Sequence, residues 1–312
     1  MEILLYGALI VAQLGITGKQ YAMKKCGSIA PGGFNSVCIN LMRSLICLAV
    51  SLVIWLVMDA NGTSISGNIV IIIAALGTAL NLFTWILSSR KVSLLLIENV
   101  SMIGSMIVPM LLAPFIYKGE KISAIQWIGC ILVFVSVFFF VNKDEGKKEG
   151  TLLSKILLVS ACALGACVSS VFRKYYSFYY EEKGIGSNEY FTLLNFVTLA
   201  VVYACMFAFY YIGSMKRAKK VAGEDSAEAT KLELPYKKIW KYVLLAAAAL
   251  YVNELFTLYA SALPSAIYFP LTRGLIILGS FILDATVFHD KITIKKIMGV
   301  VVILTAAVLV NF

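Results

Sequence analysis

Five ionisable residues lie inside long apolar stretches of this 312-residue sequence, where a charge is costly and usually faces a polar cavity or an ion partner. They are Arg43, Glu98, Glu254, Arg273 and Asp284. At a helical rise of 1.5 Å per residue, the first four lie about 10–13 Å from the nearer end of their stretches. Arginine can hold a carboxylate or phosphate through two hydrogen bonds. The four residues therefore predict either a site for a small anionic or zwitterionic molecule or structural ion pairs that fix helix rotation.

Other polar side chains share helical faces with these charges. Asn40 lies one turn before Arg43, and Tyr251 and Thr257 lie one turn on either side of Glu254. Asp284, near the end of its stretch, is instead expected to reach interfacial water or a lysine. We expect these faces and their neighbours to form one substrate-binding site: Asn40, Arg43, Asn81, Trp85, Glu98, Tyr251, Glu254, Thr257, Tyr268 and Arg273.

The composition assigns these residues to a membrane protein. Of the sequence, 60% is hydrophobic and 14% is charged, with a mean hydropathy of +0.88. An average soluble domain has about 45–50% apolar and 25% charged residues. The apolar residues also fall in blocks of about 20, which is the length that crosses a hydrocarbon core of about 30 Å. A soluble enzyme is therefore excluded, and the net charge of +10 has to be interpreted through membrane topology.

Ten hydrophobic stretches can be drawn, and helix is the expected structure because a membrane-spanning strand would be about 10 residues long with alternating polarity. The connection over 213–238 mixes charges of both signs and is expected to be a solvated linker. We predict an all-α polytopic fold with ten transmembrane helices, at about residues 3–23, 33–58, 68–89, 92–116, 123–142, 152–175, 188–212, 239–261, 264–288 and 293–311.

Lysine and arginine are unevenly divided among the connections. The odd-numbered connections and adjoining helix ends hold 20 of them, and the even-numbered ones hold 5. Because cytoplasmic connections carry the excess of positive charge, we expect the odd connections to be cytoplasmic and both termini to lie outside the cell membrane. The basic residues are spread over five connections, which does not indicate a nucleic-acid partner.

The sequence also contains an internal repeat. Glu-Lys-Ile-Ser from Glu120 matches Asp-Lys-Ile-Thr from Asp290 at an offset of 170 residues, and Gly15 matches Gly165 at an offset of 150. Because each repeat would hold five helices, an odd number, the second must lie upside down relative to the first. We therefore predict two inverted five-helix repeats, residues 1–150 and 151–312.

The closing stretch Arg273-Gly-Leu-Ile-Ile-Leu-Gly…Phe288-His-Asp-Lys-Ile-Thr…Gly299-Val-Val-Val-Ile-Leu resembles the last two helices of the drug/metabolite transporter superfamily. Phe115…Gly119-Glu-Lys-Ile-Ser…Gly129 repeats the pattern in the first half. With ten predicted helices, the whole chain is similar to the ten-helix EamA-type branch. The resemblance implies a secondary transporter that works by alternating access. It also implies a cavity formed by stretches one to four and six to nine, with stretches five and ten as peripheral supports.

The first stretch departs from the related small multidrug-resistance proteins, which carry a membrane-embedded glutamate there. This sequence has Gln13 and Lys19 in that stretch instead, so the resemblance does not lead us to expect proton-coupled efflux of cationic drugs. The opposed charges favour a small polar metabolite, anionic or zwitterionic, as the transported partner within the lipid bilayer. Two alternatives stay open: a nucleotide-sugar exchanger of the same superfamily, with a larger cavity, and a non-transporting membrane scaffold, with a sealed apolar centre. A coupling ion or counter-substrate and a homodimer are also left open.

Groups typical of other chemistries are missing from the sequence. The single histidine, His289, and the lack of Cys-x-x-Cys spacing or clustered carboxylates argue against a metal site. A phosphate-binding loop is also absent. We therefore expect no metal, no cofactor and no enzymatic activity.

Proline placement suggests where the protein bends. A proline removes a backbone donor and kinks a helix. The fourth and ninth stretches, which correspond in the two repeats, also carry Glu98 and Arg273. We therefore predict that Glu98 and Glu254 alternate as partners of Arg43 and Arg273 as the cavity opens to either side. Four of the six prolines fall in these two stretches: Pro109, Pro114, Pro264 and Pro270.

Overall fold

The computed structural model describes residues 2–58, 60–89, 91–92, 94–116, 123–140, 151–181, 183–221, 236–260, 263, 265–289 and 293–309. All regular secondary structure in these segments is helical. The elements are α1 (Glu2–Ile29), α2 (Gly33–Val57), α3 (Ile65–Ser89), α4 (Leu94–Met102), η1 (Ile103–Ile107), α5 (Val108–Ile116), α6 (Ala124–Phe140), α7 (Leu152–Tyr176), η3 (Ser177–Glu181), α8 (Asn188–Val221), α9 (Tyr236–Ala260), α10 (Ser265–Thr286) and α11 (Ile294–Leu309).

The protein is an all-helical membrane protein. Many large apolar side chains are exposed on its outer surface, as lipid contact requires and water would not favour. Within the described residues, five helices are long and apolar enough to cross a membrane: Gly33–Val57, Ile65–Ser89, Leu153–Tyr180, Asn188–Gly213 and Tyr236–Ala260.

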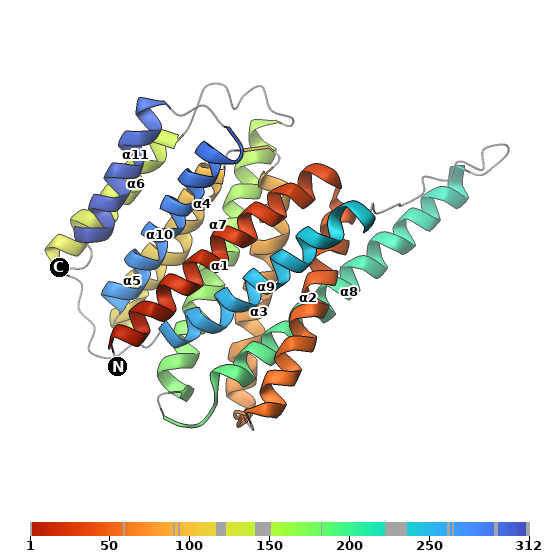
Figure 1. The fold of residues 1–312 in the computed structure, drawn as a ribbon, viewed down its shortest axis with the longest axis horizontal. Helices are drawn as coiled ribbons and strands as arrows, with labels where there is room; N and C mark the ends of the chain where they lie inside the picture. The colour runs from red at the N-terminus through yellow and green to blue at the C-terminus, as the bar shows by residue number, and fades with distance from the viewer. Residues whose placement is uncertain are drawn as a thin grey trace.

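The helices pack in pairs that are distant in sequence. The most extensive contacts join α1 to α9 and α3 to α7, followed by α2 with α8 and α6 with α11 (Figure 1). Glycines permit close approach in the two most extensive pairs. A Cβ atom on Gly15 would lie 2.8 Å from the carbonyl oxygen of Ala249 in α9, and one on Gly165 would lie 2.5 Å from the backbone nitrogen of Asn81 in α3. Each approach is closer than real Cβ contacts, so both positions require glycine.

The stretch predicted as the fourth span is not one regular helix. It consists of α4, the π-helical segment η1 and α5. Pro109, in the first turn of α5, has no backbone N–H to offer the carbonyl of Ser105, and the wider π-helical turn lies where that bond is missing. Gly104 in η1 lies against the backbone of Ala163 in α7. The irregular segment therefore fits closely against α7, beside the helical segment that carries Glu98.

Helix α8 is longer than the hydropathy pattern predicts. It continues to Val221, past residue 213, where the polar connection was expected to begin. The added segment contains lysine, arginine and alanine, which favour helix. The rest of the predicted linker before Tyr236 lies outside the described residues.

Candidate functional site

A cavity of about 100 Å³ lies between α1, α3, α4, α7, α9 and α10. Most of its wall is polar, although the helices that form it are apolar. The lining residues are Ile16, Lys19, Thr78, Asn81, Leu82, Trp85, Glu98, Ser101, Ala166, Ser169, Ser170, Arg173, Asn253, Glu254, Thr257, Tyr268, Thr272 and Ile276.

An ion pair closes one side of the cavity. Arg173 Nη2 on α7 donates to Glu254 Oε2 on α9, and both residues are buried, at 8% and 5% exposure. The Arg173 guanidinium also lies 6.0 Å from the ring centroid of Phe191, within the range of a cation–π contact. Arg173 Nε has no hydrogen-bond partner among the described residues. The guanidinium thus keeps a donor for a further group.

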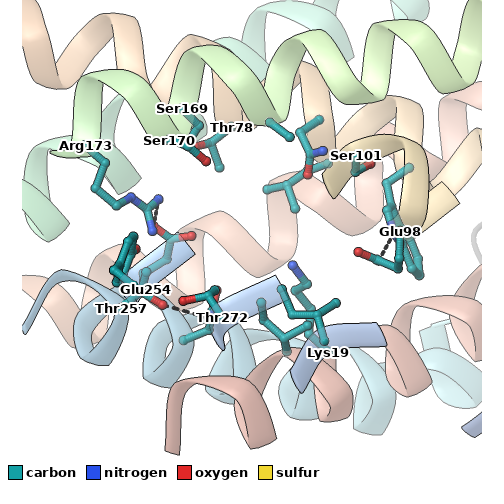
Figure 2. A pocket seen from close by; sticks show the side chains of 18 residues that line it. Lys19, Thr78, Glu98, Ser101, Ser169, Ser170, Arg173, Glu254, Thr257 and Thr272 are labelled. Carbon is teal, nitrogen blue, oxygen red and sulfur yellow. Dashed lines mark hydrogen bonds and ion pairs between the residues drawn. The ribbon is translucent and has the colours of Figure 1, made fainter. Parts of the chain in front are cut away.

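A carboxylate and an indole line the opposite side. Glu98 Oε1 on α4 accepts a hydrogen bond from Trp85 Nε1 on α3, at 2.8 Å. Figure 2 shows Arg173 and Glu254 on one side of the cavity, Glu98 on the other, and Lys19 of α1 between them. The cavity therefore presents charges of both signs at separate points of its wall.

Between these charges the wall consists of hydroxyl and amide groups. Thr78 Oγ1 and Ser169 Oγ are hydrogen bonded at 2.8 Å, joining α3 to α7. Asn253 Nδ2 donates to Thr257 Oγ1 at 3.0 Å. Thr272 Oγ1 is buried, with no hydrogen-bond partner in the described part of the chain. Such a wall can exchange hydrogen bonds with a polar ligand and position it between the two charged sides.

The structure brings together six of the ten residues predicted for a substrate site: Asn81, Trp85, Glu98, Glu254, Thr257 and Tyr268. Arg43 and Asn40 are completely buried on α2 and are not among the lining residues. Tyr251 packs against Phe196 of α8, with ring centroids 6.1 Å apart. Arg273 belongs to α10, but its side chain lies outside the part that the structure describes.

Two charged lining residues were not predicted. Both Arg173 and Lys19 lie inside the predicted stretches 152–175 and 3–23 but were counted among the charges of connections and helix ends. In the structure they lie within α7 and α1 and line the cavity. For Arg173 a signal was present, because Ser169, Ser170 and Arg173 share one helical face. The partner of Glu254 also differs from the prediction, since Arg173 takes the position expected for Arg43 or Arg273.

Asp284 meets a lysine, one of its two expected surroundings. Lys24 Nζ on α1 lies 3.1 Å from Asp284 Oδ1 on α10 and 3.7 Å from the ring centroid of Phe288. Neither charged residue lines the cavity. This ion pair joins α1 to α10 at Lys24, which follows the cavity residue Lys19 along α1.

Comparisons with known proteins show a similar arrangement of helices in a solved structure but do not assign the chain to a family. No family model matches the sequence, and no curated protein sequence matches it. A crystal structure of another protein superposes with a TM-score of 0.62, covering 97% of this chain and 94% of that chain, at 14% sequence identity. At that identity the likeness describes the arrangement of helices over nearly the whole chain and nothing of its chemistry.

Proposed function

We propose that this protein is a secondary transporter of the cell membrane that moves a small polar metabolite, anionic or zwitterionic, by alternating access. In this proposal ten transmembrane helices form two inverted repeats, the cavity binds the metabolite, and the protein is not an enzyme. The observation that carries the proposal is the polar cavity, with charges of both signs, enclosed by apolar helices. Charged groups within membrane helices are usually kept for such a site.

Corresponding contacts in the two halves support the inverted repeats. Asn253 Nδ2 on α9 donates to the carbonyl oxygen of Ala12 on α1, at 3.2 Å. Asn81 Nδ2 on α3 donates to the carbonyl oxygen of Cys162 on α7, at 2.9 Å. The asparagines are 172 residues apart and the acceptors 150 apart, and each acceptor precedes its helix's contact glycine by three residues. A rotation that exchanges the two halves would therefore superpose α1–α9 on α7–α3.

The charges of the cavity favour a zwitterion over a simple anion. Glu98 and the indole ring of Trp85 suit an ammonium group, through charge and through a cation–π contact. Lys19 and the unpaired Nε of Arg173 suit a carboxylate or phosphate. Since the two kinds of group line different parts of the wall, a ligand with both charges would satisfy both.

The size of the cavity favours a small metabolite over a nucleotide sugar. A cavity of about 100 Å³ suits a molecule the size of a small amino acid. A nucleotide sugar, with two sugar rings, a base and two phosphates, needs several times that volume. The polar wall is likewise unlike the sealed apolar centre expected of a scaffold.

A ligand screen followed by a flux measurement tests the proposal. Purified protein in detergent is heated in the presence of zwitterionic, anionic and cationic metabolites, because a ligand that binds only the folded state raises the unfolding temperature. The best ligand is then assayed for counterflow in proteoliposomes, with Glu98→Gln and Arg173→Lys as test variants. Lys238→Gln, which removes an exposed charge from α9, is the control. Stabilisation by zwitterions and flux that both test variants lose are expected, whereas no stabilisation and no flux would refute the proposal.

A further inference from the structure

Three polar side chains on α2 are completely buried away from the cavity. Asn40, Arg43 and Ser44 each have 0% relative exposure and lie within one helical turn. Arg43 Nη2 donates to Asn40 Oδ1 at 2.5 Å. Among the described residues, Arg43 Nε and Nη1, Asn40 Nδ2 and Ser44 Oγ have no hydrogen-bond partner. This α2 donor cluster thus has a positive charge and several unpaired donors, and its amide oxygen is already engaged.

The carboxylate of α9 attracts the Arg43 guanidinium without forming an ion pair with it. Cys47 Sγ on α2 donates to the carbonyl oxygen of Ala247 on α9 at 3.3 Å, and the two helices run in the same direction (Figure 1). Arg43 lies four residues before that contact and Glu254 seven residues after it. The 11-residue difference in backbone position amounts to about 16 Å along the axis, so the two charges interact at a distance and not as a direct ion pair. Glu254 is also already bound to Arg173.

The other helices packed against α2 offer no nearer carboxylate. The sequence of α3, like that of α2 itself, contains no aspartate or glutamate. The acidic residue of α8 is Glu189. The rings of Phe34 on α2 and Phe207 on α8 are 5.5 Å apart, which sets the register of these antiparallel helices. On that register Glu189 lies nine residues from the level of Arg43, about 14 Å, and it accepts a hydrogen bond from the Tyr259 hydroxyl.

We propose that the α2 donor cluster binds a small inorganic anion of the halide type, such as chloride. Glu254 is ion-paired to Arg173 and is shared by two buried guanidinium groups, so Arg43 has no counter-charge of its own within the described part of the chain. Such a buried charge is strongly unfavourable, and water could fill the hydrogen bonds but not neutralise the guanidinium. A spherical anion accepts donors from several directions, as the guanidinium, amide and hydroxyl of this turn require. The complete burial of the three side chains excludes a metabolite or a lipid headgroup. The site is separate from the cavity and does not depend on the proposed transport function.

The bound anion should stabilise the folded protein. Thermal unfolding of the purified full-length chain is measured in chloride and in gluconate at constant ionic strength. Above the dissociation constant, each tenfold increase in chloride should raise the ratio of folded to unfolded protein tenfold. Arg43→Gln should lose this dependence, and Lys238→Gln, at an exposed position of α9, should keep it. A wild type insensitive to chloride, or an Arg43→Gln variant as sensitive as the wild type, would overturn the proposal.

A second variant supplies the missing charge from within the chain. Asn40→Asp has nearly the same shape and adds a carboxylate beside the guanidinium, where it would replace the external anion. This variant should be more stable than the wild type in gluconate and insensitive to chloride. An Asn40→Asp variant with the wild-type chloride dependence would contradict the site.

Crystals of the wild type soaked in bromide locate the anion directly, whether or not the variants fold. An anomalous peak beside Arg43 Nε and Asn40 Nδ2 is expected. Peaks confined to the cavity near Lys19 and Arg173, or no peak in the protein interior, would overturn the assignment.

Discussion

The ion pair between Arg173 and Glu254 is the contact on which a single change should act most strongly. Both residues are buried, so Glu254→Gln would leave the Arg173 guanidinium without its counter-charge in a setting with little access to water. Breaking a buried pair from one side costs about 3–5 kcal/mol. At roughly 2–3 °C per kcal/mol for a chain of this length, the unfolding temperature should fall by about 6–15 °C.

A double-mutant cycle separates this effect from simple loss of packing. Arg173→Gln should cost a similar amount, whereas the Arg173→Gln/Glu254→Gln double variant removes both charges and should recover most of the lost stability. Thermal unfolding of the four proteins in the same detergent measures the coupling. Asp284→Asn is a matched control, because Lys24 has 20% side-chain exposure and contacts the Phe288 ring, so its loss of stability should be about 1 kcal/mol or less. A double variant with the full sum of the two single costs would refute the reasoning.

Three further predictions concern packing, topology and ligand binding. Gly165→Ala should destabilise the protein by about 1–3 kcal/mol in thermal unfolding because its methyl group would meet the backbone of α3. The control Gly213→Ala, which has open space around it in α8, should stabilise the protein by about 0.5–1 kcal/mol. Equal effects of the two substitutions would contradict the contact at Gly165. If both termini are outside, a cysteine at Asn61 should react with an impermeant reagent in intact cells and one at Ser214 should not, and the reverse pattern would invert the topology. Trp85→Phe keeps an aromatic ring but removes the hydrogen-bond donor to Glu98 in the cavity. Affinity for a zwitterion identified by the screen should therefore fall about 5- to 10-fold in titration calorimetry. Unchanged affinity would show that this hydrogen bond does not contribute to the site.

The all-helical membrane fold could be predicted because hydropathy reports directly what lipid and a helical backbone demand. The prediction is confirmed for the class of fold, while the ten spans and the inverted repeats stay predictions. Local departures follow from interactions that hydropathy does not record. The π-helical segment before Pro109 arises from one missing backbone donor, and the extension of α8 to Val221 arises from the helix propensity of charged residues.

The site was harder to predict because depth along a helix can be counted from sequence, whereas rotation cannot. Arg43 is at the depth expected for a central residue, but its face of α2 packs against neighbouring helices such as α8 and α9 and does not line the cavity. Arg173 and Lys19 were left out because they lie near the ends of their predicted stretches, where a long basic side chain can reach the membrane surface. Only the packing of α1 and α7 around the cavity distinguishes such residues from surface charges.

The glycine contacts also limit how the walls of the cavity can move. If α1 slid along α9 by about one helical turn, a residue on the same face, such as Ala12 or Lys19, would have to occupy the place of Gly15, where even one added carbon would clash with the α9 backbone. The same restriction applies to α7 on α3 at Gly165. Each helix pair is therefore locked against sliding and can only tilt as a unit. Any change in access to the cavity would have to hinge between the two locked pairs, carrying Lys19 with one and Trp85 with the other.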